Sequence, residues 1–142
     1  DLPDPFLFKE MPVIVKRLYQ AITTRESVMI YGDYDTDGIT STALLINFFN
    51  RLGVPARFYV PNRFTDGYGL HESRLRQLFH SHHFTLLITV DCGSTQEDTI
   101  ASLRQLGVDT IVTDHHKAHK RPENALGVLN PSIPGCTFPD RN

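Results

Sequence analysis

Residues 27–53 read SVMIYGDYDTDGITSTALLINFFNRLG, and this stretch decides the fold. Its first six residues form an apolar run typical of a buried strand, which ends at Asp33. A helical pattern follows over residues 38–52, and Gly53 supplies a stop. The face of this helix that we expect to be buried consists of Ile39, Thr42, Ile46 and Phe49. The stretch therefore predicts one strand followed directly by one helix.

Strands and helices alternate along the rest of the chain. Further strands are predicted at residues 56–62, 85–91 and 109–114. Further helices are predicted at residues 13–22, 71–80 and 96–107. After Pro122 the pattern ends in a proline-rich stretch that we interpret as a loop. This alternation at short spacing predicts an α/β fold, with a mostly parallel sheet covered by helices.

Composition narrows the class of protein. The 142 residues suit one domain, and the formal net charge of −2 gives no overall basic field for nucleic acid. Two distant cysteines favour a reduced, cytoplasmic location, and no apolar run approaches the roughly 20 residues that span a membrane. The first residues lack an initiator Met and a signal-peptide pattern, so we expect an internal part of a longer chain.

Acidic residues and histidines follow the ends of the predicted strands. They are Asp33, Asp35 and Asp37 after the first strand, Asp91 after the third, and Asp114, His115 and His116 after the fourth. In open α/β sheets, ligands bind outside the carboxyl ends of the strands. Crowded carboxylates raise one another's pKa unless a cation offsets their charge, and oxygen with imidazole ligands suits a divalent metal.

Three kinds of site could explain DYDTDG at residues 33–38. It matches the start of a calcium-binding EF-hand loop, but Leu44 stands where that loop requires a glutamate. It also approaches the Asp-x-Asp pair of haloacid-dehalogenase phosphatases, with Asp35 as nucleophile, which leaves Asp91 and the histidines without roles. A metal-dependent phosphoesterase uses all of these residues. Structural zinc is disfavoured by the oxygen-rich ligand set.

The sequence resembles a known family at three separate places. YGDYDTDGITS (residues 31–41), TVDCG (89–93) and VTDHH (112–116) are similar to the first three motifs of the DHH phosphoesterases. FYVPNRFTDGYGL (58–70) is similar to the RecJ branch of single-strand-specific 5′→3′ DNA exonucleases. The likeness extends from about Phe8 to Pro131. It implies phosphodiester hydrolysis by metal-activated water, in DNA repair and recombination.

The resemblance also implies a site for Mn²⁺ or Mg²⁺, with two ions expected. Asp37, Asp91 and His115 match the ligands of one ion, and Asp91 is placed to bridge. Asp35 and Asp91 match ligands of the other ion, and Asp33 either joins them or supports the loop.

Other residues are expected to act on the substrate or on the ligands. The resemblance places His116 near the scissile phosphate, so we expect His116 and Asp91 to be catalytic. Asp114 is expected to orient the histidines or to cap a helix. Four residues are candidates for binding phosphate or DNA: Arg63, Asn62, Ser41 and Tyr68. A surface ion pair for Arg63 and simple loop packing for Tyr68 remain alternatives.

We interpret residues 1–130 as the N-terminal part of a DHH phosphoesterase domain. Residues 131–142 would be a loop leading to a fourth motif and a C-terminal domain, so this chain alone is expected to be weakly active or inactive. Expected partners are single-stranded DNA and a single-strand-binding protein or helicase, with a monomeric state and no membrane. Two rivals stay open: a DHH phosphodiesterase of short oligonucleotides or cyclic dinucleotides, and a non-catalytic module that binds a partner.

Overall fold

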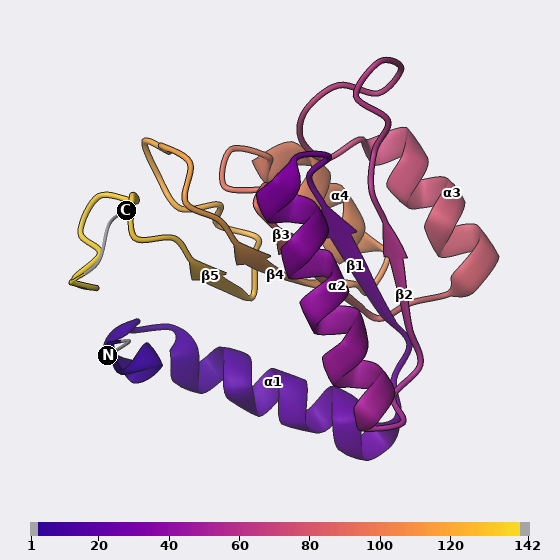
Figure 1. The fold of residues 1–142 in the computed structure, drawn as a ribbon, viewed down its shortest axis with the longest axis horizontal. Coiled ribbons are helices and arrows are strands. Elements are labelled where there is room, and N and C mark those ends of the chain that lie inside the picture. Colours follow the sequence, from indigo (N-terminus) through magenta and orange to yellow (C-terminus); the bar gives the residue numbers. More distant parts are fainter. Residues whose placement is uncertain (1–2, 140–142) are drawn as a thin grey trace.

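A five-stranded parallel sheet forms the centre of the computed structural model, which describes residues 3–139 (Figure 1). The strand order is β2-β1-β3-β4-β5, and each neighbouring pair is parallel. The strands are β1 (Val28–Gly32), β2 (Ala56–Tyr59), β3 (Leu86–Val90), β4 (Asp109–Thr113) and β5 (Gly127–Leu129). The predicted α/β fold with a parallel sheet is confirmed.

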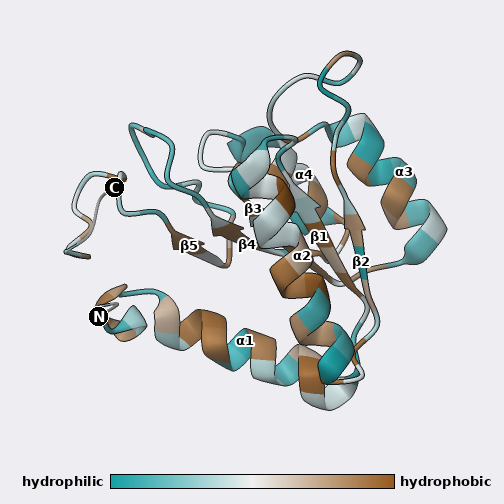
Figure 2. Ribbon diagram, in the orientation of Figure 1, coloured by the Kyte–Doolittle hydropathy of each residue, from teal (hydrophilic) through white to brown (hydrophobic). Residues whose placement is uncertain are grey.

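Helices cover both faces of the sheet. The helical elements are η1 (Pro5–Leu7), α1 (Met11–Thr24), α2 (Thr36–Arg51), α3 (Glu72–His82) and α4 (Glu97–Gln105). Successive side chains of a strand point to opposite faces. Val28 and Ile30 accordingly belong to the core beneath α1 and α2, whereas Met29 and Tyr31 belong to the core beneath α3 and α4. Figure 2 shows mainly hydrophobic strands between helices with alternating hydrophobic and hydrophilic bands.

No helix among the described residues is long and apolar enough to cross a membrane.

The structure corrects several sequence predictions. The segment after Pro122 is not all loop, because β5 pairs with β4 there. Three residues are too few to show a strand period, and this strand depends on its neighbours for stability. In addition, Ile39 is 51% exposed, although the helical pattern places it in the core. Gly38, Thr42 and Phe49 are the buried residues of α2.

Gly38 determines how α2 meets the sheet. A Cβ atom at this position would overlap the backbone oxygen of Asp33, which no side chain could avoid. Only glycine, which has no Cβ atom, allows this close approach of the two backbone segments. The helix also begins at Thr36 rather than at residue 38, because the Asp35 side chain caps it by accepting a hydrogen bond from the Gly38 N–H.

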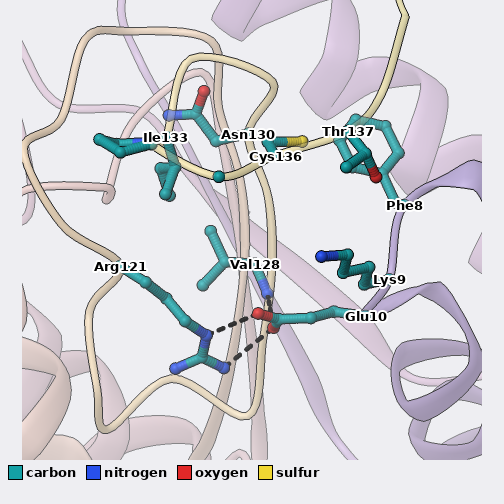
Figure 3. A pocket seen from close by; sticks show the side chains of 11 residues that line it. Phe8, Lys9, Glu10, Arg121, Val128, Asn130, Ile133, Cys136 and Thr137 are labelled. Carbon is teal, nitrogen blue, oxygen red and sulfur yellow. Dashed lines mark hydrogen bonds and ion pairs between the residues drawn. The ribbon is translucent and has the colours of Figure 1, made fainter.

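Glu10 connects the start of α1 to β5 (Figure 3). Its Oε1 and Oε2 atoms accept hydrogen bonds of 2.6 and 2.9 Å from the Arg121 guanidinium, and Oε2 also accepts one of 2.8 Å from the Val128 N–H. A cavity of about 180 Å³ lies beside this ion pair and is lined by Phe8 and Ile133, among others. The carboxylate thus holds the short edge strand against the first helix.

Replacing Glu10 should loosen this end of the sheet. Glu10→Gln keeps the shape of the side chain but removes the charge that Arg121 binds. We expect the free energy of unfolding to fall by about 1–3 kcal/mol, the range for hydrogen bonds to charged groups. Urea unfolding followed by circular dichroism measures this change.

The matched control is Glu123→Gln, because Glu123 is exposed. We expect it to change stability by less than about 0.5 kcal/mol. Equal stabilities of the two variants would contradict the role given to Glu10.

Candidate metal centre

Three aspartates meet where neighbouring strands end. Gly32, Val90 and Thr113 lie in register on β1, β3 and β4, and Asp33, Asp91 and Asp114 follow them directly. Backbone hydrogen bonds continue the ladder past the strand ends. The donors are the N–H groups of Asp33 to Val90 (3.2 Å), Asp91 to Thr113 (2.9 Å) and Asp114 to Leu129 (3.0 Å). The ladder therefore fixes the three carboxylates side by side.

Two groups of possible metal ligands form around these aspartates. Asp33, Asp35 and Asp91 make one group, and Asp91, His115 and His116 make the other; in each, ligand atoms lie within 4.8 Å of one another. Nε2 of His115 is 3.0 Å from Oδ1 of Asp91. Asp91 belongs to both groups and so occupies the position that a bridging ligand would need.

Asp91 is buried in an unusual backbone conformation. Its φ is 63°, in the left-handed region that few residues other than glycine adopt, and its exposed fraction is 7%. The turn continues through Gly93, with φ of 109°, and the Thr89 hydroxyl donates to the Cys92 carbonyl at 2.8 Å. Such local strain concentrates at functional sites. The turn aims Asp91 into the cluster of acids.

Two carboxylate oxygens in this cluster are suited to a cation. Within residues 3–139, Oδ1 of Asp33 and Oδ2 of Asp91 are buried and have no hydrogen-bond partner. Burying a polar atom without a partner costs free energy, and a buried carboxylate costs more. A divalent cation would supply the missing partner, because Mn²⁺ and Mg²⁺ favour oxygen ligands.

The shifted pKa values of the acids also indicate that this cluster favours a bound cation. Burial, together with the neighbouring Asp35, raises the pKa of Asp91 to about 6. Burial also raises the pKa of Asp33, assisted by the charge of Asp35. The pKa of Asp35 is lowered, chiefly by the hydrogen bond from the Gly38 N–H. Without a cation, Asp33 and Asp91 retain a proton more readily than isolated carboxylates do.

Asp114 uses both of its oxygens within the protein. Oδ1 accepts from the N–H groups of His115 (2.7 Å) and His116 (3.1 Å), and it lies 2.8 Å from Nδ1 of His116. Oδ2 accepts from the Ser94 N–H at 3.1 Å. Burial alone would raise the pKa of Asp114, but hydrogen bonds from His116 and Ser94 outweigh it and lower the pKa. These contacts are those of a residue that orients the histidines.

The His116 ring has a defined hydrogen-bond pattern. A carboxylate only accepts, so Nδ1 of His116 must carry the proton it shares with Asp114, and Nε2 is the other ring nitrogen. Burial lowers the pKa of His116, but the hydrogen bond and the charge of Asp114 together raise it by more than burial lowers it. The net shift of the pKa is therefore upward. The Tyr68 hydroxyl lies 3.1 Å from the same Nδ1.

Asp37 and Ser41 line an open cleft of about 520 Å³ together with Asp91 and His115. The carboxylate of Asp37 joins neither ligand group among the described residues, although the resemblance leads us to expect that it shares an ion with His115. Its role as a ligand remains a prediction.

Three of the four candidates for binding phosphate or DNA lie on the loop between β2 and α3, and the fourth, Ser41, lies on α2. The guanidinium of Arg63 lies over the ring of Tyr34, 5.6 Å from its centroid. Oδ1 of Asn62 accepts from the Phe64 N–H at 2.9 Å, so this side chain shapes the loop itself. Tyr68 lies farther along the same loop and contacts His116. Contacts of these residues with phosphate or DNA stay predictions.

Sequence reasoning missed two residues that hold the histidine segment, Asn130 and Ser132. The Asn130 side chain is 3% exposed and donates to the Ser94 hydroxyl at 2.8 Å and to the His116 carbonyl at 2.9 Å. The Ser132 hydroxyl donates to the His115 carbonyl at 2.8 Å. A polar residue directly after the apolar run GVL was the available signal, because the other strands also end before functional residues.

Comparison with known proteins gives one family and a consistent set of relatives. The sequence profile described as "DHH family, N-terminal domain" matches residues 27–138. The single-stranded-DNA-specific exonuclease RecJ of Bacillus subtilis (strain 168) is 40% identical over 139 residues, which cover 98% of this chain and 18% of that protein. The chain thus spans about a fifth of the length of this relative.

Two solved structures share the fold. The crystal structure of exonuclease RecJ bound to manganese matches with a TM-score of 0.81 and 33% identity, over 98% of this chain and 33% of that chain. RecJ from Thermus thermophilus, in complex with Mn²⁺, matches with a TM-score of 0.71 and 30% identity, over 96% of this chain and 19% of that chain. Both are similar to this chain over nearly all of its length.

Removing the charge of Asp91 should stabilise the metal-free chain at neutral pH. Its folded pKa of about 6 exceeds the unfolded value of ~3.9, so its stabilising contribution is present below about pH 4 and lost as the pH rises to about 6. The side chain of Asp91→Asn does not titrate, so this variant lacks the loss of stability that deprotonation of Asp91 causes in the parent. Its free energy of unfolding relative to the parent should therefore rise by about 1–3 kcal/mol between about pH 4 and pH 7. Urea titrations with a chelator measure this difference.

Asp98→Asn is the control, because Asp98 is exposed on the first turn of α4. We expect its difference from the parent to be nearly the same at both pH values. If Asp91→Asn behaved in the same way, the raised pKa of Asp91 would be disproved.

Proposed function

Because the chain belongs to the DHH family, we propose that it forms the N-terminal part of the catalytic core of a metal-dependent phosphodiesterase that hydrolyses single-stranded DNA from the 5′ end. The observation that carries the proposal is the pair of buried, unpartnered carboxylate oxygens on Asp33 and Asp91, within residues 3–139. They lie in the two ligand groups that share Asp91. The similarity to single-stranded-DNA-specific exonucleases supports the choice of substrate.

Asp91 would hold two Mn²⁺ or Mg²⁺ ions together. We assign Asp33 and Asp35 to one ion, and His115 with Asp37 to the other. Divalent ions, when bound, lower the pKa of water and stabilise negative charge on phosphate oxygens. The similarity to RecJ structures that contain manganese supports this assignment.

The protein groups around the ions have separate tasks. Asp114 binds Nδ1 of His116, which leaves Nε2 as the nitrogen able to contact a phosphate oxygen or hold a proton. Asp37 lies in the first turn of the 16-residue helix α2. Backbone N–H groups at the N-terminus of a helix attract phosphate. Ser41 lines the same cleft and adds a hydroxyl donor. Arg63, Asn62 and Tyr68 would contact the DNA from the loop after β2.

The domain assignment remains part of the proposal. Residues 1–130 would form the N-terminal part of the phosphoesterase domain, and residues 131–142 would lead to a fourth motif and a C-terminal domain. The share of the Bacillus subtilis relative that is covered, 18%, supports this arrangement. We expect the 142 residues alone to hydrolyse DNA weakly or not at all. The monomeric state, the cytoplasmic location, and a single-strand-binding protein or helicase as partner are likewise proposals.

The natural protein that contains this chain should degrade long single-stranded DNA in the presence of Mn²⁺ or Mg²⁺. We expect activity to vanish with EDTA and to fall at least about a hundredfold in Asp91→Ala, because both ligand groups lose their common member. The measurement is nucleotide release from DNA labelled at the 5′ or the 3′ end.

The same assay separates the rival functions. Faster cleavage of dinucleotides or cyclic dinucleotides than of long DNA would favour a phosphodiesterase of small substrates. Full activity in Asp91→Ala would exclude the metal mechanism. Full processive activity from the 142 residues alone would contradict the domain assignment.

Asp114→Asn should weaken metal binding without unfolding the chain. The amide keeps the shape of the side chain but loses the charge that accepts from His115 and His116. Replacing such orienting groups typically costs 10- to 100-fold in metal affinity, so we expect a loss of about that size. Titration with Mn²⁺, followed by electron paramagnetic resonance of the free ion, measures the affinity. An affinity equal to that of Asp98→Asn would refute the orienting role.

A further inference from the structure

We propose that Tyr68 is a positioning residue that, together with Asp114, fixes the ring of His116 at the metal centre. The Tyr68 hydroxyl lies 3.1 Å from Nδ1 of His116. The two rings also meet edge to face, with centroids 5.3 Å apart and planes at 64°. This role rests on the proposed function, since it concerns the histidine assigned to the substrate phosphate.

The hydrogen bonds of His116 define what Tyr68 can do. Nδ1 carries one hydrogen, and the Asp114 carboxylate at 2.8 Å is its stronger acceptor. The phenol oxygen, at 3.1 Å, accepts a weaker share of the same N–H. A single hydrogen bond leaves an imidazole free to rock about it. A second partner and a ring contact from another element remove that freedom.

Tyr68 is 43% exposed, but the loop residues on each side of it are held by hydrogen bonds. The Tyr31 hydroxyl, on a residue that is fully buried in β1, donates to the Gly69 carbonyl at 3.1 Å. His71 makes a further contact of 3.3 Å, from Nε2 to the Gly67 carbonyl. Both glycines have positive φ, 79° at Gly67 and 92° at Gly69, so the loop can turn sharply on each side of Tyr68.

These contacts form a continuous path from the sheet to His116. Tyr31 holds the Gly69 carbonyl, Gly69 directly follows Tyr68 in the loop, and Tyr68 contacts Nδ1 of His116, the same ring atom that Asp114 binds. The DNA-binding role given to Tyr68 by the sequence would use its ring face instead. The two roles differ in one atom, because stacking on a base needs the ring and positioning needs the hydroxyl.

Tyr68→Phe tests the proposal, because it removes the hydroxyl and keeps the ring. In the natural protein that contains this chain, with Mn²⁺ and single-stranded DNA, we expect kcat to fall by about three- to tenfold, the effect of one hydrogen bond. KM should stay within about twofold. Tyr19→Phe is the matched control, because Tyr19 is 68% exposed on α1. It should leave both constants unchanged.

A spectroscopic readout tests the positioning directly and needs no activity. In the chain labelled with ¹⁵N-histidine, two-bond ¹H–¹⁵N correlations report which ring nitrogen carries the proton, and His116→Gln identifies the His116 signals. We expect the Nδ1–H form of His116 in the parent, with shifted or averaged ring signals in Tyr68→Phe. Tyr31→Phe should produce a smaller change of the same kind, since it loosens the loop one step away.

Unchanged kcat and unchanged His116 signals in Tyr68→Phe would overturn the proposal. An increase of KM alone would also overturn it, because Tyr68 would then act on DNA binding. A fall in kcat with unaltered His116 signals would show that the hydroxyl acts on the substrate rather than on the histidine, which equally contradicts it. If the parent hydrolyses no DNA, the proposed function fails, and the His116 signals alone still decide the role of Tyr68.

Discussion

Repulsion among Asp33, Asp35 and Asp91 is the constraint on which this end of the molecule depends. Carboxylates at such separations would move apart in a flexible chain, and here the backbone ladder prevents it. The ladder is in turn held by a core on both faces of the sheet. The hydrophobic core thus provides the free energy that keeps the acids together. A bound cation would reduce their repulsion and stabilise the folded chain.

The two ends of the sheet use charge in opposite ways. At the amino end, Arg17 is 8% exposed and pairs with Glu26 and Asp109, each at 2.7 Å. These three charges have protein partners, and the cluster links α1 to β4. At the carboxyl end, negative charge is concentrated, and within residues 3–139 two buried carboxylate oxygens remain without partners. The paired charges at the amino end stabilise the fold, whereas the unpartnered oxygens at the carboxyl end are available to bind a ligand.

Sequence patterns predicted what depends on local periodicity and on strand ends. Four strands, four helices and the meeting of the acids followed from alternation and from the topology rule for parallel sheets. β5 could not be predicted, because three residues carry no period and the pairing partner is distant in sequence. The outward position of Ile39 was missed for another reason: at this end of α2 Gly38 rather than Ile39 packs against Asp33, whereas Thr42 and Phe49 of the same predicted face are buried. The Tyr68–His116 contact joins residues 48 apart, which spacing alone does not reveal.

The late position of Asn130 and Ser132 has a consequence for the order of events during synthesis. These residues hold the carbonyl groups of His115 and His116, and Val128 binds Glu10 across 118 residues of chain. Such non-local contacts form slowly, since a long loop must close first. A nascent chain that has emerged only as far as the Asp-His-His motif therefore has its acids but not the clamp on its histidines. The order of residues in the chain thus delays completion of the metal centre until Ser132, which follows β5, has left the ribosome.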